Sequence, residues 1–202
     1  EEIQSNLNTG VMGKAIIHRD EVGSTQDVAE QMARQGAPEG TVVIAERQTQ
    51  GRGRMDRHWA SPEGVGVYLS LILKPNVSPR QFIQIPLVAG VALSLAIEQM
   101  CCLRPGLRWP NDIVLGGKKA AGILTEMSSE MDRIKYVILG IGVNVNTPKS
   151  VLPKSIRDTA TSLATECGDP FSRVKLVQCL LSEFEALYDK FLTGGFAAIR
   201  GL

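Results

Sequence analysis

The chain has 202 residues, of which 44% are hydrophobic, and this is enough to build the core of one domain. Its 22 Lys and Arg side chains nearly balance its 21 Asp and Glu side chains, for a net charge of +1, whereas nucleic-acid-binding domains usually carry a clear basic excess. No signal-peptide pattern opens the chain, and the longest apolar run, residues 85–97, is too short to cross a bilayer. We therefore expect a cytoplasmic protein that does not enter a membrane.

The cysteines and histidines do not fall into a metal-binding spacing such as C-x-x-C. We expect free thiols in a reducing compartment and no metal ion held by protein ligands. The residues concerned are Cys101, Cys102, Cys167, Cys179, His18 and His58.

The first part of the chain alternates strands with one helix. Ser24 or Thr25 is expected to cap the helix, with Asp27 in its first turn and Gly36 at its end. Apolar residues alternate along the third strand, so its two faces are expected to meet different layers. The expected elements are a strand at 14–22, a helix at 23–36, a strand at 41–47 and a strand at 66–74.

The second part of the chain is rich in strands and closes with helices. Its apolar segment predicts a long helix from Ser78 and Pro79 to about Cys101, with small residues that would let it lie close to a sheet. The expected elements that follow are two strands within 107–129 around a Gly116-Gly117 turn, a strand at 133–146, a short helix near 158–167, and a helix at 172–192 that ends before Gly194 and Gly195. The order predicts an α+β (mixed α/β) fold with a mixed, mainly antiparallel sheet flanked by helices.

A loop of about 15 residues contains Gly51-Arg52-Gly53-Arg54, and a loop of this length inside a domain is usually functional or disordered. Glycine lets backbone N–H groups approach a ligand, and arginine grips a carboxylate or phosphate at two points. The segment suits a site where two anions are brought together. A solvated basic loop, or a nucleic-acid-binding module that uses Arg52 to Arg57, remains an alternative.

Three further segments carry polar residues that packing does not require. "GSTQ" (23–26) places hydroxyl and amide groups at a helix N-terminus, which also fits simple capping. "RWPNDIVLGGKK" (108–119) ends in two lysines that a strand would point to opposite faces, so that only one can enter a site. In "GIGVNVN" (140–146), glycines interrupt a strand as if something approaches its backbone, and Asn144 is either a ligand contact or a turn residue.

Taken in order and spacing, "STQ", "AERQTQGRGRMDRHWASP", "RWPNDI", "KKAAGIL" and "GIGVNVN" resemble the biotin protein ligases over residues 14–192. The most specific signs are G-R-G-R followed by R-x-W-x-S-P, and W-P-N-D with a lysine seven residues beyond its aspartate. The resemblance implies a catalytic domain similar to class II aminoacyl-tRNA synthetases and lipoate ligases.

The family's activity is what the resemblance implies for this chain. Biotin and ATP, with Mg²⁺ carried by ATP, would form biotinyl-5′-AMP, and biotin would then pass to a lysine of the biotin carboxyl carrier protein domain of acetyl-CoA carboxylase or a similar enzyme. The enzyme alternative is a lipoate or octanoyl ligase on the same fold, although the glycine-rich segment with a histidine that marks those proteins is not found in this sequence.

The resemblance also implies roles for individual residues. Those expected to act in catalysis are Arg52, Arg54, Asp112 and Lys119. Those expected to bind biotin are Ser24, Thr25, Gln26, Gln48, Arg52, Gly53, Arg54, Lys119, Gly122 and Leu124. Those expected to bind ATP or the adenylate are Gly51, Arg52, Arg54, Trp59, Arg108, Asn111, Lys119, Ile123 and Asn144.

Two positions depart from the family pattern: Gln26 replaces the usual asparagine, and Asp56 replaces a glycine of the loop. Residues 1–13 resemble a connector from an N-terminal domain, residues 14–202 form the expected catalytic domain, and the family's C-terminal SH3-like domain is not recognised. The resemblance makes a homodimer plausible. It predicts DNA binding and repression of biotin synthesis only for a full-length form with an N-terminal DNA-binding domain.

Overall fold

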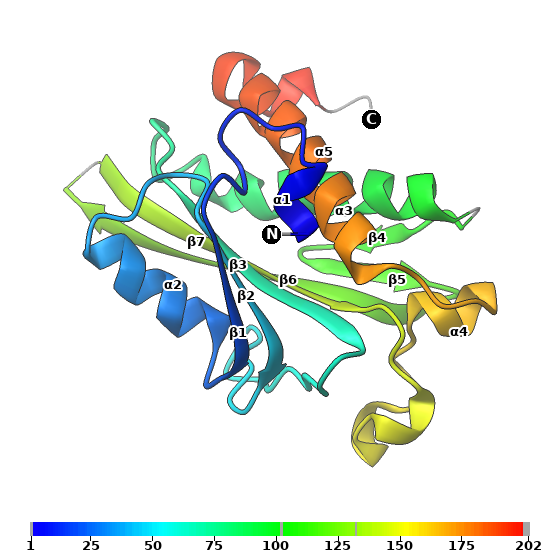
Figure 1. The fold of residues 1–202 in the computed structure, drawn as a ribbon. Helices are drawn as coiled ribbons and strands as arrows, with labels where there is room; N and C mark the ends of the chain where they lie inside the picture. Colours follow the sequence, from blue (N-terminus) through cyan, green and yellow to red (C-terminus); the bar gives the residue numbers. More distant parts are fainter. Residues whose placement is uncertain (1, 102, 132, 200–202) are drawn as a thin grey trace.

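The computed structural model describes residues 2–101, 103–131 and 133–199, and its centre is a seven-stranded sheet in the order β1-β2-β3-β7-β6-β5-β4 (Figure 1). β1 pairs with β2 in parallel, as a β-α-β connection requires, and the other neighbours are antiparallel. The strands are β1 (Ile16–Val22), β2 (Val42–Gln48), β3 (Gly66–Leu73), β4 (Gly106–Arg108), β5 (Asp112–Leu115), β6 (Lys118–Glu130) and β7 (Arg133–Asn144).

Helices cover both faces of the sheet, with α3 and α5 on one face and α2 on the other (Figure 1). The α-helices are α1 (Glu2–Ser5), α2 (Thr25–Arg34), α3 (Ile85–Met100), α4 (Leu163–Cys167) and α5 (Arg173–Gly194). The 3₁₀ turns are η1 (Phe82–Gln84), η2 (Lys149–Val151), η3 (Lys154–Ile156) and η4 (Phe196–Ala198). The expected mixed, mainly antiparallel sheet flanked by helices is confirmed.

β3 shows how one strand serves two layers. Val67, Leu69 and Leu71 belong to the larger core under α3 and α5, whereas Ile72 belongs to the smaller core under α2. Ser70 points to the α2 side and is fully buried. The alternation predicted from the sequence is therefore correct, and it brings a hydroxyl to the face where the site forms.

α3 is the central core helix. The segment Phe82–Met100 is, within the described ranges, the one helical stretch whose length and composition would allow it to cross a bilayer. Here Val88, Leu93 and Ile97 are fully buried, and the helix packs against α5 and β6. An all-round apolar helix is expected in the middle of a core.

Two helix starts differ from the sequence prediction. α3 begins at Ile85 instead of Ser78 or Pro79, because Pro86 fits the first turn of a helix but not its interior. α4 begins at Leu163 instead of residue 158, because the preceding backbone pairs with β6: the N–H of Thr161 donates to the carbonyl of Lys119 at 2.9 Å.

Smaller differences occur at other element ends. The strand predicted from residue 14 begins at Ile16, and α2 ends at Arg34, before Gly36. α5 continues through Gly194, and only Gly195 lies beyond it, with φ 65°. The short helix α1 lies within the expected connector and packs against α5.

Candidate active site

The N-terminus of α2 meets the end of β2 in a cluster of buried polar groups. The Ser24 hydroxyl caps the helix by accepting from the N–H of Gln26 at 3.3 Å. The Oε1 atom of Gln48 accepts from the Thr25 N–H at 2.9 Å and from its hydroxyl at 3.1 Å, while Nε2 donates to Ser61 Oγ at 2.9 Å. The structure thus brings together the four polar residues that the sequence assigned to biotin from these two elements.

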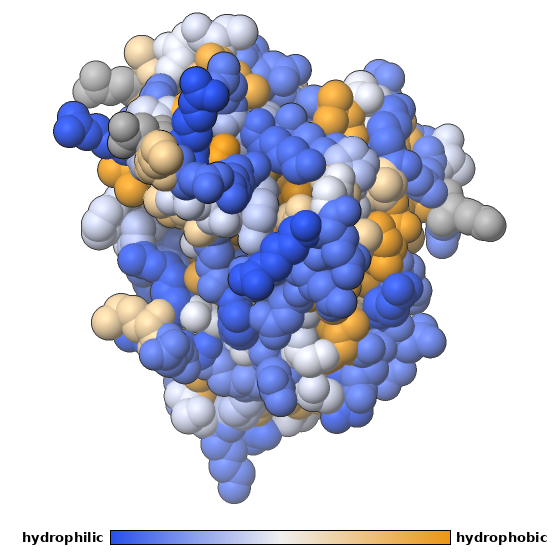
Figure 2. Space-filling model, turned by 90° about the vertical axis from the view of Figure 1, so that its left-hand side faces the viewer, coloured by the Kyte–Doolittle hydropathy of each residue, from blue (hydrophilic) through white to orange (hydrophobic). Residues whose placement is uncertain are grey.

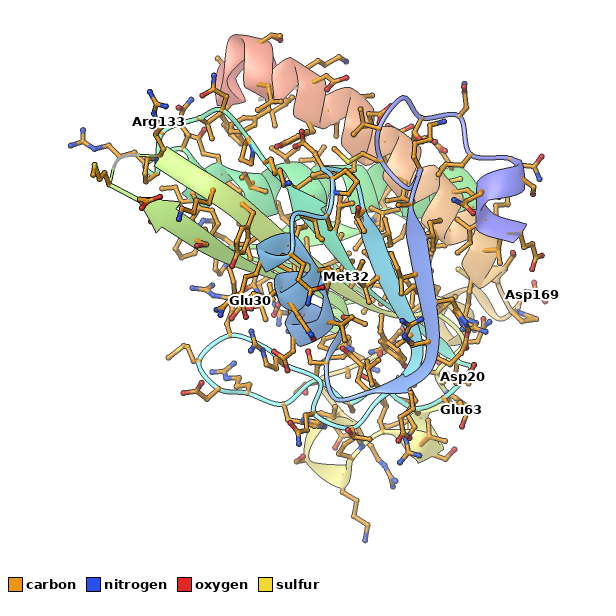
Figure 3. All side chains as sticks on the ribbon, turned by 60° about the vertical axis from the view of Figure 1, so that its left-hand side comes forward. Asp20, Glu30, Met32, Glu63, Arg133 and Asp169 are labelled. Atoms are coloured by element: carbon orange, nitrogen blue, oxygen red, sulfur yellow. The ribbon has the colours of Figure 1, made fainter. Side chains whose placement is uncertain are left out.

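The arginine loop, residues 49–65, folds back on itself between β2 and β3. Its turn is closed by the N–H of Gly53, which donates to the carbonyl of Arg57 at 2.7 Å, and by the N–H of Trp59, which donates to the carbonyl of Gly51 at 2.8 Å. In Figure 3 this loop lies at the end of the sheet where Asp20 and Glu63 are labelled, whereas Arg133 marks the opposite end.

Two loop arginines reach the neighbouring elements. Arg52 Nη1 lies 2.8 Å from Asp27 Oδ1 on α2, and its Nη2 pairs closely with Glu126 Oε2 on β6. Arg54 Nη1 donates to Asn111 Oδ1 at 3.3 Å. The loop is therefore anchored across the site, with the Arg54 guanidinium beside the Trp-Pro-Asn-Asp segment.

The Trp59 side chain lies on the glycines of β6 and β7. A Cβ atom at Gly142 would come within 2.6 Å of the indole, and one at Gly122 within 3.0 Å. The Lys119 ammonium lies 5.4 Å from the ring centroid, within cation–π range. The indole Nε1 is buried and has no hydrogen-bond partner among the residues that the structure describes. The glycines that interrupt these strands thus make room for an aromatic side chain of the protein itself.

Lys119 is the lysine that enters the site. Its Nζ lies 2.7 Å from Asp112 Oδ1, whereas Lys118 is exposed. The sequence left these two lysines undecided from alternation, and the resemblance favoured Lys119.

Two cavities adjoin at the side chains of Arg54 and Lys119. The polar residues of α2 and β2, with the glycines of β6 and β7, line the first cavity. The second opens beside it under residues 152–160. The residues that line both are Gly53, Arg54, Trp59, Asn111 and Lys119. Positive charge therefore lies where a ligand in one cavity would meet a ligand in the other.

The residues predicted to bind biotin all line the first cavity. Of the residues predicted to bind the adenylate, those that line the second cavity are Arg54, Trp59, Arg108, Asn111, Lys119 and Asn144. Arg52 and Ile123 line the first cavity only. Ligand contact for each of these residues remains a prediction.

Gly51, which was also predicted to bind the adenylate, lies outside both sets of lining residues, and its ligand contact stays a prediction. A Cβ atom there would come within 2.4 Å of the Trp59 carbonyl oxygen and 2.9 Å of Ser61 Oγ. Gly51 therefore closes the base of the loop. Asn144 is buried, and its Nδ2 donates to the carbonyl of Thr161 at 3.0 Å.

Three residues that contact the lining side chains were missed in the sequence: Asp27, Ser70 and Glu126. Ser70 Oγ lies 2.9 Å from both Thr25 Oγ1 and Gln26 Oε1. Glu126 Oε2 accepts from Gln26 Nε2 at 2.8 Å. Strand alternation offered a signal for Glu126, because residues 122, 124 and 126 share one face of β6.

Within residues 2–101, 103–131 and 133–199, no group of three or more His, Cys, Asp or Glu side chains is arranged to hold a metal ion. Cys101, Cys167 and Cys179 are free thiols, and burial with the neighbouring Cys101 raises the pKa of Cys167 to about 11. Cys102 lies outside the described residues.

The mixed, mainly antiparallel sheet flanked by helices is the fold that the resemblance predicts for the biotin and lipoate ligase class. Residues 20–144 match the Biotin/lipoate A/B protein ligase family, and the chain belongs to this family. Within the family, its similarity is to biotin protein ligases, as the sequence predicted.

Two curated relatives illustrate this similarity. The chain is 45% identical over 199 residues to the bifunctional ligase/repressor BirA of Bacillus subtilis, and this covers 98% of the chain and 61% of the relative. It is 34% identical over 171 residues to the biotin–[acetyl-CoA-carboxylase] ligase of Mycobacterium tuberculosis, with 82% and 61% covered. The chain thus spans about three fifths of the length of these relatives.

Solved structures agree. The biotin protein ligase of Aquifex aeolicus in complex with biotin and ATP superimposes with a TM-score of 0.80 at 36% identity, covering 93% of this chain and 76% of that one. The fold class predicted from the resemblance is thereby confirmed.

Proposed function

We propose that this protein is a biotin protein ligase, which activates biotin with ATP and transfers it to a lysine of an acceptor protein. The observation that carries the proposal is the meeting of two cavities at Arg54 and Lys119. The Aquifex aeolicus relative holds biotin and ATP, and the relatives described above are named as biotin ligases.

The first cavity suits the ring system of biotin. A cyclic urea carries one carbonyl acceptor and two N–H donors, and Thr25, Gln26 and Gln48 supply hydroxyl and amide groups of both kinds. Leu69 and Leu124 supply apolar surface on the same wall. A small apolar pocket with a few placed polar groups is the usual form of a small-molecule site.

The first chemical step joins two anions. A biotin carboxylate oxygen attacks the α-phosphorus of ATP, the bond from phosphorus to the bridging oxygen breaks, and pyrophosphate leaves. Arg54 and Lys119 offset the repulsion and the charge that grows on the phosphoryl oxygens. We assign Mg²⁺ to the phosphates of ATP, whose charge it would offset, because this ion is usually held by substrate phosphates with few protein ligands.

In the second step the neutral amine of an acceptor lysine attacks the acyl carbon, and AMP leaves. The proton passes to Asp112, which lies beside Lys119, or to the adenylate itself. Trp59 and the arginine loop keep water away from the mixed anhydride in this scheme. The carrier domain of acetyl-CoA carboxylase is the proposed acceptor, in line with the name of the Mycobacterium tuberculosis relative.

Three further elements of the proposal concern the whole protein. Free Cys101, Cys167 and Cys179 suit a cytoplasmic location. A repressor role of the full-length protein would follow the name of the bifunctional ligase/repressor of Bacillus subtilis. A homodimer, and DNA binding through an N-terminal domain, are the third element and rest on the family resemblance alone.

The test is ATP–pyrophosphate exchange by the full-length protein with biotin, with lipoate or with neither. Biotin-dependent exchange, followed by labelling of a purified carrier domain, is the expected result. Exchange that depends on lipoate would favour the second candidate of the same family. Exchange with neither acid would sink the proposal.

A further inference from the structure

Glu126 connects three elements beside the first cavity, through Gln26 and Arg52, which line it. On β6, its Oε2 accepts from Gln26 Nε2 of α2 at 2.8 Å and pairs closely with Arg52 Nη2 of the loop. Arg52 is also held at its other nitrogen, by Asp27 Oδ1 at 2.8 Å. The side chain of Arg52 is 37% exposed and that of Glu126 is 46% exposed, so both remain open to a ligand or to solvent.

The carboxylate fixes which way the Gln26 amide faces. Ionised Glu126 accepts hydrogen bonds and donates none, so the NH₂ group of Gln26 must face it and Oε1 must face the other way. Oε1 then accepts from Ser70 Oγ at 2.9 Å. The same oxygen packs closely against the backbone of Gly140 on β7, where an added Cβ atom would lie only 2.6 Å from it.

Ser70 connects the Gln26 amide to a second group of polar side chains. Ser70 Oγ lies 2.9 Å from Thr25 Oγ1, which in turn lies 3.1 Å from Gln48 Oε1. The amide nitrogen of Gln48 then donates to Ser61 Oγ at 2.9 Å. The charged acceptor therefore fixes the Gln26 amide and favours the Ser70 proton pointing to Gln26 Oε1, whereas the Gln48 amide is oriented by Thr25 and Ser61.

We propose that Glu126 is a positioning residue that sets the hydrogen-bonding pattern of the first cavity through Gln26 and anchors the arginine loop through Arg52. With Glu126 in place, the Gln26 carbonyl oxygen is turned away from the carboxylate and toward Ser70, and the amide that lines the cavity is held in one orientation. The recognition of a cyclic urea rests on the proposed function. The anchoring of the loop does not.

The test is Glu126→Gln, which removes the charge at nearly constant volume. Losing a charged hydrogen-bond acceptor should raise the KM for biotin in pyrophosphate exchange about 10- to 100-fold, with kcat at saturating biotin within about threefold. In the unliganded protein, trypsin should cut after the loop arginines several times faster. Glu126→Asp keeps the charge and should recover part of both properties.

Glu130→Gln is the matched control. Glu130 ends the same strand and pairs with Lys135 at 2.8 Å, with its side chain 66% exposed, so both readings should stay at the wild-type values. Wild-type KM and cleavage rate in Glu126→Gln would overturn the proposal. If wild-type protein shows no biotin-dependent exchange, the proposed function fails while the cleavage test still decides the anchoring.

If Glu126→Gln does not fold, the second variant Arg52→Gln tests the anchor, because it breaks the same ion pair from the side of the exposed loop. Faster cleavage after Arg54 and Arg57 supports the anchor. Unchanged cleavage there overturns it.

Discussion

The Nζ atom of Lys119 lies 2.7 Å from Oδ1 of Asp112, and the two side chains are only 33% and 23% exposed. The same ammonium lies 5.4 Å from the centroid of the Trp59 ring. A carboxylate and an indole thus hold one flexible cation at the junction of the two cavities. A positioned charge costs no reorganisation when charge develops on a ligand, which is the property that an adenylating site needs.

Lys119→Ala should reduce biotin-dependent pyrophosphate exchange about 100- to 1000-fold, the usual cost of losing one such charge-stabilising donor. The melting temperature should stay within a few degrees, because the Asp112 carboxylate left behind still reaches solvent. Lys118→Ala changes the exposed neighbour and should leave exchange unchanged. An unaffected rate in Lys119→Ala would refute its role.

Gly142→Ala should displace Trp59, since the new Cβ atom would lie 2.6 Å from indole Cε2 and Nε1. The chain has two tryptophans, and Trp109 is 78% exposed, so the measurement needs a Trp109→Phe background. There, Gly142→Ala should shift the emission maximum to longer wavelength as Trp59 gains solvent. It should also weaken ATP binding.

The control for this experiment is Gly10→Ala, where the nearest atom to an added Cβ lies at an ordinary 3.6 Å. Its emission spectrum should match that of the background protein. An unshifted spectrum in Gly142→Ala would mean that the indole does not rest on this glycine in solution.

The sequence predicted these features in part. The glycines of β7 were interpreted as a place where something approaches the backbone, and Trp59 does approach Gly142. What approaches cannot be known from alternation within one strand, because the indole arrives from a loop 83 residues earlier. Glu126 was missed for a related reason: its partners Gln26 and Arg52 come from a helix and a loop that only the folded chain brings together.

Most element positions were predicted because periodicity is a local signal. The start of α4 was not, because the two segments that settle it are far apart: the N–H of Lys119 donates to the carbonyl of Thr159 at 2.8 Å. Because the Thr159 carbonyl accepts this hydrogen bond from β6, it does not accept the bond that a helix starting at residue 158 would require. Contacts at the protein surface are harder still to predict from the sequence, because surface positions accept many residue types. Figure 2 shows one face of the molecule, which is largely hydrophilic with small hydrophobic patches.

Asp56 has a left-handed backbone conformation, with φ 57°, directly after Met55 at φ 56°. Glycine adopts this region without cost, aspartate tolerates it, and alanine is disfavoured by about 1–2 kcal/mol. Asp56→Gly should therefore bind biotin at least as tightly as the wild type, whereas Asp56→Ala should bind about 5- to 30-fold more weakly. Titration calorimetry with biotin measures this order, and equal affinities for the two variants would contradict it.

Glu185 of α5 ties the N-terminal segment to the core. Its carboxylate accepts from the N–H groups of Gly10 at 2.5 Å, Val11 at 2.8 Å and Met12 at 2.7 Å. Burial alone would raise the pKa of Glu185, but these three donors outweigh it and lower the pKa. The contribution to stability is therefore present above the pKa of the unfolded state, about 4.3, and is lost as the pH falls through the lowered folded value.

Glu185→Gln should consequently lower the free energy of unfolding by about 1–3 kcal/mol at pH 7, because the donors lose a charged acceptor. The difference from wild type should begin to shrink below about pH 4, where the unfolded wild-type carboxyl becomes neutral, and should shrink further as the pH falls through the lowered folded pKa. Urea denaturation at both pH values measures this, with Asp189→Asn, an exposed change on the same helix, as the control. A difference that stays constant from pH 7 to pH 3 would show that the charge of Glu185 is not what holds residues 10–12.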